Sequence, residues 1–258
     1  MKIGIIGAGP MGSAMVYAFK DHEVMLCDRH PEKLKKLIVS TSNLFSEPDA
    51  LIPFVDAVLF AVKPQSFEAL MGSITTNLND RLILSVMAGI TTTQLRTQTQ
   101  AQQVIRCMPN LGVQLKTGVT AWFATEAVTE VQRAFIAESL SAVGIQVELK
   151  KESLLDAVTA ISGSGPAYFF LLAEALTMAA EAMGLTPEQA RKIAEGTLVT
   201  SGHLMASQKR SAGDWKREIM VSGGTTEAAI LSFKHSHFNQ MVAKAARAAL
   251  QRSQELRI

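Results

Sequence analysis

Gly7-Ala8-Gly9-Pro10-Met11-Gly12 is the stretch that decides the fold of the first half of this chain. An apolar run at residues 3–6 precedes it, and a segment with helical spacing of apolar residues, 11–19, follows it. In a strand–turn–helix unit the first glycine permits the tight turn, the second lets the backbone approach a pyrophosphate, and the third lets the helix pack close to the strand. Free N–H groups at the helix start then face the anion. The turn therefore predicts a dinucleotide-binding βαβ unit, with candidate cofactor contacts at Gly7, Gly9, Pro10, Met11 and Gly12.

More apolar runs follow in the first half, and segments with helical spacing, such as residues 31–37, lie between several of them. Runs that are apolar throughout are typical of strands buried on both faces. Their alternation with helices predicts a mainly parallel, doubly wound α/β sheet that is covered on both sides. The runs lie at residues 24–27, 57–62, 82–87, 104–108 and 119–123.

The character of the chain changes near residue 152. From about Leu154 onward the strand-like runs stop and long stretches rich in alanine, leucine and methionine begin. Thr186-Pro187-Glu188-Gln189 marks a helix start, with Thr at the N-cap, Pro at the first helical position and Gln three residues after the cap. We therefore expect a sheet domain over residues 1–152 and an all-α domain over 153–258. The expected helices cover residues 166–183, 187–206, 215–219, 226–231 and 238–256.

Composition and charge exclude several classes of function. The 258 residues carry a formal net charge of +2 with no long basic run, which argues against a nucleic-acid partner. Cys27 and Cys107 lie far apart and show no metal-ligand spacing, so we expect no metal site and two reduced thiols in a cytoplasmic protein. The apolar stretch 166–183 contains Glu174 and Glu181, which a membrane span tolerates poorly. We expect a buried core helix there and no membrane partner.

The same stretch predicts a homodimer. Tyr168-Phe169-Phe170-Leu171-Leu172 places apolar side chains on more than one face of a helix. Such a helix needs packing partners on several sides, and the second half of the chain offers few. A second copy of the chain, interlocked through the helical domain, would supply the missing burial.

The second apolar run ends in Asp28 and Arg29, about twenty residues after the glycine-rich turn, where an acid accepts hydrogen bonds from the adenosine ribose of NAD. Arg29, His30 and Lys33 could instead hold the 2′-phosphate of NADP. Both cofactors stay open at this point.

The carboxyl ends of other expected strands belong to the same cleft. Ala61-Val62-Lys63 ends one strand, and Lys63 could neutralise cofactor charge. Ala88 follows another strand and leaves room for a nicotinamide ring. Asn110 follows a third and could hydrogen-bond a carboxamide or a substrate.

Two glycine-rich loops interrupt the helical half, at residues 162–166 and 222–226. A glycine pair followed by threonines at a helix start can present consecutive N–H groups to a carboxylate. The second loop, with Gly223, Gly224, Thr225 and Thr226, is therefore a candidate site for a small acid.

The chain resembles the pyrroline-5-carboxylate reductase family over essentially its whole length. The resemblance runs through GAGPMG, AVKPQ, MAGIT, VIRCMPN, AVTAISGSGPAYFF and SGGTTEAAI in that order. It implies a Rossmann-type doubly wound sheet followed by an all-α C-terminal dimerisation domain. It also implies NAD(P)H-dependent reduction of the C=N bond of 1-pyrroline-5-carboxylate to L-proline, the last step of proline biosynthesis, and assembly of dimers into larger oligomers.

The resemblance also implies roles for single residues. Gly224 and Thr225 would offer N–H groups to the substrate carboxylate, and the hydroxyl of Thr226 would meet the ring nitrogen. Ala61, Val62, Lys63 and Ala88 would touch the cofactor. An imine needs little acid catalysis, so positioning would supply most of the rate enhancement.

Two departures keep alternatives open. Leu111-Gly112 stands where the family usually has Thr-Pro, and Val221-Ser222 stands where it usually has Ser-Pro. A divergent reductase of another cyclic imino acid, a β-hydroxyacid-dehydrogenase-like enzyme and a non-catalytic NAD(P)-binding protein are the other hypotheses. The second half contains no Lys-x-x-x-Asn spacing of the kind that β-hydroxyacid dehydrogenases use.

Overall fold

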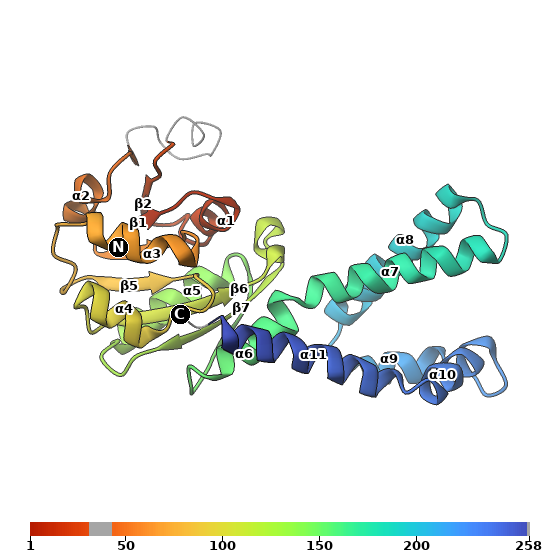
Figure 1. Ribbon diagram of the computed structural model, residues 1–258. Helices are drawn as coiled ribbons and strands as arrows, with labels where there is room; N and C mark the ends of the chain where they lie inside the picture. The colour runs from red at the N-terminus through yellow and green to blue at the C-terminus, as the bar shows by residue number, and fades with distance from the viewer. Residues whose placement is uncertain (31–42, 257–258) are drawn as a thin grey trace. The chain divides into compact units, whose positions relative to one another are not determined.

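The computed structural model describes residues 1–30 and 43–256 (Figure 1). The chain forms two compact units. One comprises Met1–Gly163 together with Ala249–Ile258 and contains the sheet; the other comprises Ser164–Ala248 and is helical. The expected helix over residues 31–37, and Lys33 with it, lies outside the described residues.

The sheet unit is built on one sheet, which in the described part of the chain has eight strands in the order β3-β2-β1-β4-β5-β6-β7-β8. Every neighbouring pair is parallel except β6 and β7, which are antiparallel. The predicted doubly wound sheet is confirmed, and each of the six apolar runs forms a strand. These six strands are β1 (Lys2–Ile6), β2 (Glu23–Cys27), β4 (Ala57–Phe60), β5 (Leu82–Ser85), β6 (Val104–Pro109) and β7 (Gly118–Ala124).

The two strands at the edges of the sheet have no clear signal in the sequence. β3 (Leu44–Phe45) has only two residues, too few to show a pattern. β8 (Gly144–Glu148) alternates Ile145 and Val147 with polar residues, and both apolar side chains are largely exposed. Edge strands lack the continuous apolar character of strands that are covered on both faces.

Helices cover both faces of the sheet and form two separate cores. Met15 and Phe19 from the region of α1 pack with Ile136 and Leu140 of α5 on one face. Residues of the regions α2 to α4, with Leu95 among them, pack on the other. Each fully buried apolar side chain of this size contributes about 1.5–3 kcal/mol. The helices are α1 (Pro10–Ala18), α2 (Pro48–Leu51), α3 (Phe67–Ser73), α4 (Thr92–Thr99), α5 (Glu130–Ser141) and α6 (Leu154–Val158), with 3-10 turns η3 (Ile52–Phe54), η4 (Pro64–Ser66) and η5 (Leu111–Leu115) and the π-helical turn η6 (Thr159–Gly163).

The second half is helical throughout, as predicted. α7 packs along α8 (Figure 1). The predicted helix start at Thr186 is confirmed, because its hydroxyl accepts from the N–H of Gln189 at 3.3 Å and the Gln189 side chain accepts from the N–H of Thr186 at 3.0 Å. The helices are α7 (Gly165–Ala182), α8 (Pro187–Ser207), α9 (Ala212–Ile219), α10 (Thr225–His235) and α11 (Phe238–Glu255).

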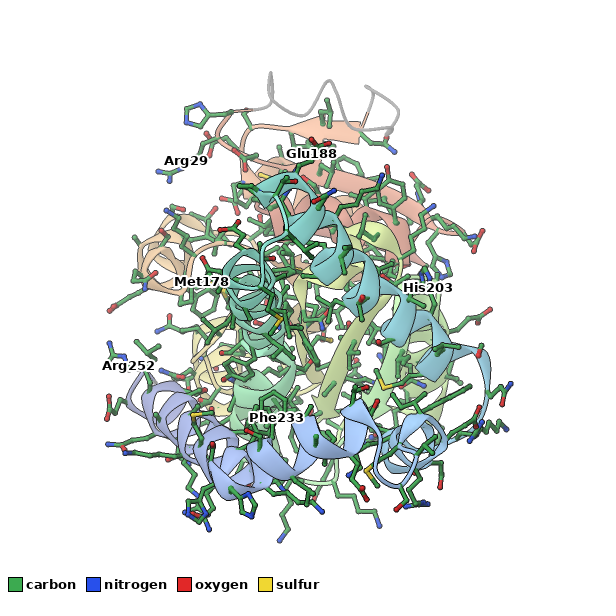
Figure 2. All side chains as sticks on the ribbon, turned by 90° about the vertical axis from the view of Figure 1, so that its right-hand side faces the viewer. Arg29, Met178, Glu188, His203, Phe233 and Arg252 are labelled. Atoms are coloured by element: carbon green, nitrogen blue, oxygen red, sulfur yellow. The ribbon has the colours of Figure 1, made fainter. Side chains whose placement is uncertain are left out.

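The expectation that residues 166–183 form a buried core helix is wrong for the single chain. Phe169, Phe170 and Leu171 are 54%, 61% and 65% exposed, and the buried residues of α7 are Gly165 and Ala173. Met178 on α7 and Phe233 on α10 are exposed as well (Figure 2). Residues 154–182 are long and apolar enough to cross a membrane by length and composition alone, which for one such helix is weak evidence. Within one chain α8 covers only part of the surface of α7, and these apolar side chains stay exposed.

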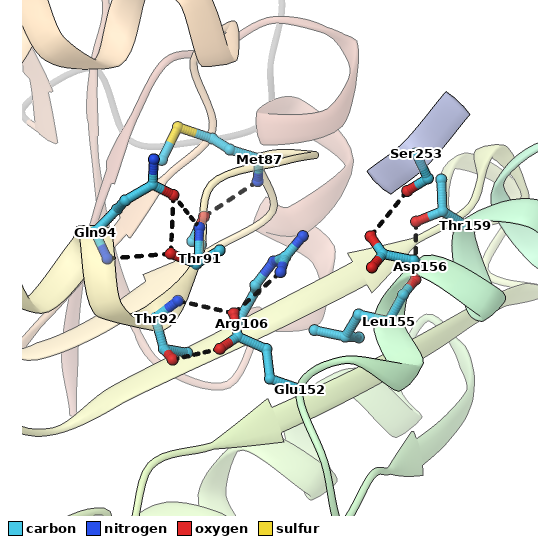
Figure 3. Close-up of polar contacts among 11 residues, drawn as sticks. Met87, Thr91, Thr92, Gln94, Arg106, Glu152, Leu155, Asp156, Thr159 and Ser253 are labelled. Atoms are coloured by element: carbon cyan, nitrogen blue, oxygen red, sulfur yellow. Dashed lines mark hydrogen bonds and ion pairs between the residues drawn. The ribbon is translucent and has the colours of Figure 1, made fainter. Parts of the chain in front are cut away.

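The compact sheet unit extends past the predicted domain boundary near residue 152, to Gly163, and takes in the end of α11. Figure 3 shows the contacts that hold this segment. Glu152 forms an ion pair with buried Arg106 at 3.0 Å, and it accepts from the N–H and hydroxyl of Thr92 at 2.8 and 2.6 Å. The hydroxyl of Ser253 donates to buried Asp156 at 2.9 Å. These polar contacts join α6 and the last turns of α11 to the sheet unit, which the change in composition at residue 152 does not reveal.

Candidate active site

The glycine-rich turn joins β1 to α1, and the two outer glycines are required by its backbone. Gly7 has φ +97°, in the region that favours glycine, and its N–H donates to the Cys27 carbonyl at 2.8 Å. A Cβ on Gly12 would lie 1.9 Å from the Gly7 carbonyl oxygen. The helix therefore approaches the strand as closely as the sequence predicted.

Gly9 differs from the other two, because a Cβ added there would meet nothing within 4 Å. Gly9 is the N-cap of α1, and no side chain caps this helix. Pro10 has no N–H, and the N–H groups of Met11 and Gly12 are at the first turn, where they have no partner within the helix. An open backbone surface with unpaired N–H groups at a helix start fits a dinucleotide pyrophosphate.

Asp28 lies at the carboxyl end of β2 and contacts the glycine-rich turn directly. One carboxylate oxygen accepts from the N–H of Ala8 at 2.9 Å, and the other accepts from the N–H of His30 at 2.9 Å. Asp28 is half-buried, whereas Arg29 is exposed at the periphery of the sheet unit (Figure 2). The acid that the sequence singled out is thus fixed against the turn that would hold the pyrophosphate.

The tips of β4 and β5 lie at the same edge of the sheet as this turn. The N–H of Ala61 donates to the Ile6 carbonyl at 2.9 Å, and a Cβ on Gly7 would lie 2.8 Å from the Ala61 carbonyl oxygen. Ala61 and Val62 are half-buried, whereas Lys63 and Ala88 are exposed. Since β1, β4 and β5 are parallel neighbours, the structure brings these predicted cofactor contacts together.

Asn110, at the tip of β6, has structural partners that the sequence did not reveal. Its Oδ1 accepts from the N–H groups of Gly112 at 3.1 Å and Val119 at 3.0 Å. Its Nδ2 donates to the hydroxyl of Ser162 at 3.2 Å. Because an amide nitrogen has two hydrogens, one donor is left for a ligand. The side chain organises the loop after β6 as well as offering that donor.

Ser162 belongs to η6, the π-helical turn before α7. A Cβ on the neighbouring Gly163 would lie 3.2 Å from the Met108 methyl, so this turn also packs on β6. π-helical turns are rare and occur often at functional sites. Ser162 and Gly163, at the start of the first glycine-rich loop, therefore pack against the carboxyl end of β6.

The second glycine-rich loop begins α10. Gly223 has φ +73°, and Gly224 is the N-cap. The N–H of Gly224 donates to the Val221 carbonyl at 3.0 Å, so this predicted donor already has a partner. Thr225 and Thr226 occupy the first two helical positions, where N–H groups have no partner within the helix. Thr226 is half-buried.

Glu227 is a residue of this loop that sequence reasoning missed. Its Oε2 accepts from the N–H of Gly223 at 2.7 Å. In a capping box a glutamate at the third helical position accepts from the N–H of the N-cap. Glu227 instead accepts from the residue before the N-cap, because the N–H of Gly224 donates to the Val221 carbonyl. The spacing of Gly224 and Glu227 therefore predicts a bond at the start of α10 but not its donor, Gly223.

Comparison with known proteins assigns the family. Residues 152–256 match the family described as pyrroline-5-carboxylate reductase dimerisation, and residues 2–89 match the family described as NADP oxidoreductase, coenzyme F420-dependent. The pyrroline-5-carboxylate reductase of Pseudomonas aeruginosa is 35% identical over 99% of this chain and 96% of its own length. The chain belongs to the pyrroline-5-carboxylate reductase family. The reductase of Haemophilus influenzae is 33% identical over 98% of this chain and 97% of its own length.

Solved structures agree with this membership. The pyrroline-5-carboxylate reductase of Coxiella burnetii has a TM-score of 0.91 at 28% identity, and covers 98% of this chain and 97% of its own. The structure from Streptococcus pyogenes has a TM-score of 0.85 at 28% identity, covering 99% and 98%. The Rossmann-type sheet followed by a helical dimerisation domain is thus the fold of the family.

One departure from the usual family sequence has a structural consequence here. Gly112 donates its N–H to Asn110, a bond that a proline at this position could not make. A Cβ on Gly112 would also lie 3.0 Å from the Gly118 Cα. The loop after β6 is therefore closed by a hydrogen bond in this member of the reductase family.

Proposed function

We propose that this chain reduces the C=N bond of 1-pyrroline-5-carboxylate to L-proline with NADH or NADPH, the last step of proline biosynthesis. The proposal is supported by the exposed backbone at Gly9–Gly12, where N–H groups are free to bind a pyrophosphate. It is supported also by the family relationship, which spans 99% of the chain. The named relatives are pyrroline-5-carboxylate reductases.

The turn at Gly223–Thr226 is the proposed substrate site. Gly223 and Gly224 shape the turn, while their own N–H groups bond Glu227 and Val221. The donors for the substrate carboxylate are therefore the N–H groups of Thr225 and Thr226, in place of the pair Gly224 and Thr225 that the family resemblance implies. Hydrogen bonds to a charged group contribute about 1.5–3 kcal/mol each, enough to orient a small acid.

The hydroxyl of Thr226 is the proposed contact of the ring nitrogen, and Thr226 is the catalytic candidate for that reason. A hydroxyl can accept from a protonated imine nitrogen or donate to a neutral one. The bound nicotinamide supplies the hydride. The chain's own contribution is to hold the ring carbon at near-attack distance, because an iminium carbon is already electrophilic.

On the cofactor side, the N–H groups of Met11 and Gly12 are the proposed pyrophosphate donors. Ala61, Val62 and Ala88 line the cleft with small or half-buried side chains, and Lys63 neutralises cofactor charge. Asn110 contributes its remaining Nδ2 hydrogen and fixes the loop after β6.

Residues 153–258 are the proposed dimerisation and substrate domain. Phe169, Phe170 and Leu171 of α7 expose apolar side chains next to one another in the chain. Contiguous exposed apolar surface is typical of a protein–protein interface. We propose a homodimer through this domain, which can assemble further. Cys27 and Cys107 are both free and buried, in keeping with a cytoplasmic location.

The test is steady-state oxidation of NADH and of NADPH with racemic 1-pyrroline-5-carboxylate, with proline measured as the product. We expect oxidation of the cofactor and formation of proline in equal amounts. Dinucleotide binding without turnover would overturn the proposal and identify a non-catalytic NAD(P)-binding protein. Turnover with a different cyclic imino acid but not with this one would identify a divergent reductase.

A further inference from the structure

The loop between β5 and α4 carries Ala88, the proposed contact of the nicotinamide ring. Met87 and Ile90, on either side of it, are 2% and 3% exposed and pack in the core, whereas Ala88 is exposed. Gly89 turns the chain between Ala88 and Ile90 with φ +80°, a conformation that favours glycine. The loop therefore presents one small side chain at the carboxyl end of β5, and the place of that side chain depends on how the loop is anchored where α4 begins.

Glu152 anchors the start of α4 from 60 residues away in the sequence (Figure 3). Thr92 is the first residue of α4, and its N–H donates to one carboxylate oxygen of Glu152 at 2.8 Å while its hydroxyl donates to the other at 2.6 Å. The N–H groups of a first helical turn have no partner within the helix, and a negative charge at that end interacts favourably with the helix dipole. One carboxylate therefore holds both the backbone and the side chain of the residue with which the helix begins.

Arg106 makes the charge of Glu152 important for this contact. The guanidinium is 3% exposed, and its Nη1 donates at 3.0 Å to the same oxygen that accepts from the Thr92 N–H. Arg106 lies opposite Ser85 in the parallel pair of β5 and β6, and the Ser85 hydroxyl accepts from the N–H of Met87 at 3.2 Å. A buried arginine that loses its carboxylate partner is strongly destabilising. The ion pair thus links β6 to the helix start, next to the strand from which the loop leaves.

We propose that Glu152 is a positioning residue for the nicotinamide end of the cofactor, acting through Thr92 and the loop that carries Ala88. The inference rests on the proposed function, which places the nicotinamide at Ala88. Without the carboxylate the start of α4 loses its two bonds, and the loop before it is free to shift. The glycine-rich turn keeps its own contacts, because it is built from β1 and α1. Loss of the carboxylate should therefore affect one end of the dinucleotide and spare the other.

The experiment titrates the two ends of the dinucleotide separately by calorimetry, without substrate. The better-bound of NADH and NADPH is compared with its fragment that lacks the nicotinamide, ADP-ribose or 2′-phospho-ADP-ribose. We expect the unmodified protein to bind the reduced cofactor more tightly than the fragment, because contacts to the ring add to the affinity. Glu152→Gln removes the charge and one acceptor oxygen. It should weaken the reduced cofactor by about tenfold, as expected for the loss of one hydrogen bond to a charged group, and leave the affinity for the fragment unchanged.

Thr92→Val tests the same contact and leaves the ion pair with Arg106 in place. It removes the bond from the hydroxyl and keeps the bond from the N–H, so affinity for the reduced cofactor should fall by a smaller factor, about threefold. Thr92→Ser keeps the hydroxyl and should restore the affinity. Glu148→Gln is the matched control, because Glu148 also pairs with an arginine of the sheet unit, Arg133, but lies on the edge strand β8. It should change neither affinity.

The comparison with the fragment separates positioning from a general loss of structure, which would weaken both ligands equally. Equal weakening by Glu152→Gln would therefore overturn the inference, and so would unchanged affinity for both ligands. Equal affinity of the unmodified protein for the reduced cofactor and the fragment would overturn it as well. If Glu152→Gln does not fold, the two Thr92 variants decide, and equal affinities in them would contradict the role of Glu152. Since no titration needs turnover, a protein that shows the expected split but reduces no imine would contradict the proposed function alone.

Discussion

The side-chain amide of Asn110 donates to the hydroxyl of Ser162, 52 residues away, with the nitrogen and oxygen 3.2 Å apart. This bond links the tip of β6 to the π-helical turn that precedes α7. The Asn110 side chain also accepts from the N–H of Gly112 in η5 and from the N–H of Val119 at the start of β7. One side chain thus sets the shape of two segments that border the proposed cofactor cleft.

Replacing Asn110 by alanine should therefore destabilise the protein. The change removes the acceptor of the Gly112 and Val119 N–H groups, and we expect the free energy of unfolding to fall by about 1–3 kcal/mol. Asn110→Asp keeps the acceptor oxygen and should recover most of the loss. Ser162→Ala removes a single neutral hydrogen bond and should cost about 0.5–1.5 kcal/mol. Urea unfolding of the three variants measures these values, and equal stability of Asn110→Ala and the unmodified protein would contradict the role of this side chain.

Gly9 and Gly12 give a pair of substitutions with opposite outcomes. Gly9→Val places a side chain in open space, so the melting temperature should stay unchanged. Affinity for NADH and NADPH should fall, because the added side chain occupies the surface that would bind the pyrophosphate. Gly12→Ala forces a Cβ to within 1.9 Å of a backbone oxygen, so it should lower the melting temperature itself. Thermal unfolding and calorimetry of both variants test this division. Normal dinucleotide binding by Gly9→Val would show that the glycine-rich turn is not part of the cofactor site.

Much of this fold could be predicted because its buried strands are apolar on both faces. The six central strands and the helices of the second half follow from runs and periodicity in the sequence. What could not be predicted depends on single polar contacts. Glu152 pairs with Arg106 across the end of the sheet, and Ser253 binds Asp156 from a distance of 97 residues in the sequence. No local pattern in the sequence indicates such partners, so the compact sheet unit extends beyond the change in composition near residue 152.

The candidate site could likewise be predicted only in part. The Gly7–Gly12 turn and Asp28 could be predicted because a defined backbone geometry demands glycine and a fixed spacing to the acid. The proposed donors of the diglycine turn depend on two bonds that the sequence does not reveal, from Gly223 to Glu227 and from Gly224 to Val221.

Thr226→Ala should lower kcat/KM for the imine by about tenfold to hundredfold, the loss expected when one hydrogen bond to a charged or developing charged group disappears. Affinity for the dinucleotide should stay unchanged, because the substitution leaves the sheet unit intact. Thr226→Ser keeps the hydroxyl and should retain most of the activity. Steady-state kinetics with separate cofactor titration tests this, and full activity of the alanine variant would show that the diglycine turn does not hold the substrate.

Asp49 gives the sheet unit a pH dependence of stability in acid. Its carboxylate accepts from the hydroxyl of Thr75 at 2.6 Å and from the N–H of Thr76 at 2.9 Å, and these bonds, with the Thr75 hydroxyl the largest contributor, lower the pKa of Asp49 from 3.8 to about 2. Because the pKa is lower in the folded state, the stabilisation is fully present above pH 3.8 and is lost as the pH falls toward about 2. The unmodified protein should therefore unfold in less urea as the pH is lowered through this window.

The matched comparison is Asp49→Asn, which removes the titrating group and accepts fewer bonds. The difference in urea midpoint between the unmodified protein and this variant should be largest near neutral pH and should shrink between about pH 4 and pH 2. Asp80→Asn, which removes an exposed carboxylate of the same unit, serves as the control for the loss of one negative charge. A difference between Asp49→Asn and the unmodified protein that stays constant across the window would mean that Asp49 is not the group whose protonation weakens the fold, because only a group with a lowered pKa loses its contribution there.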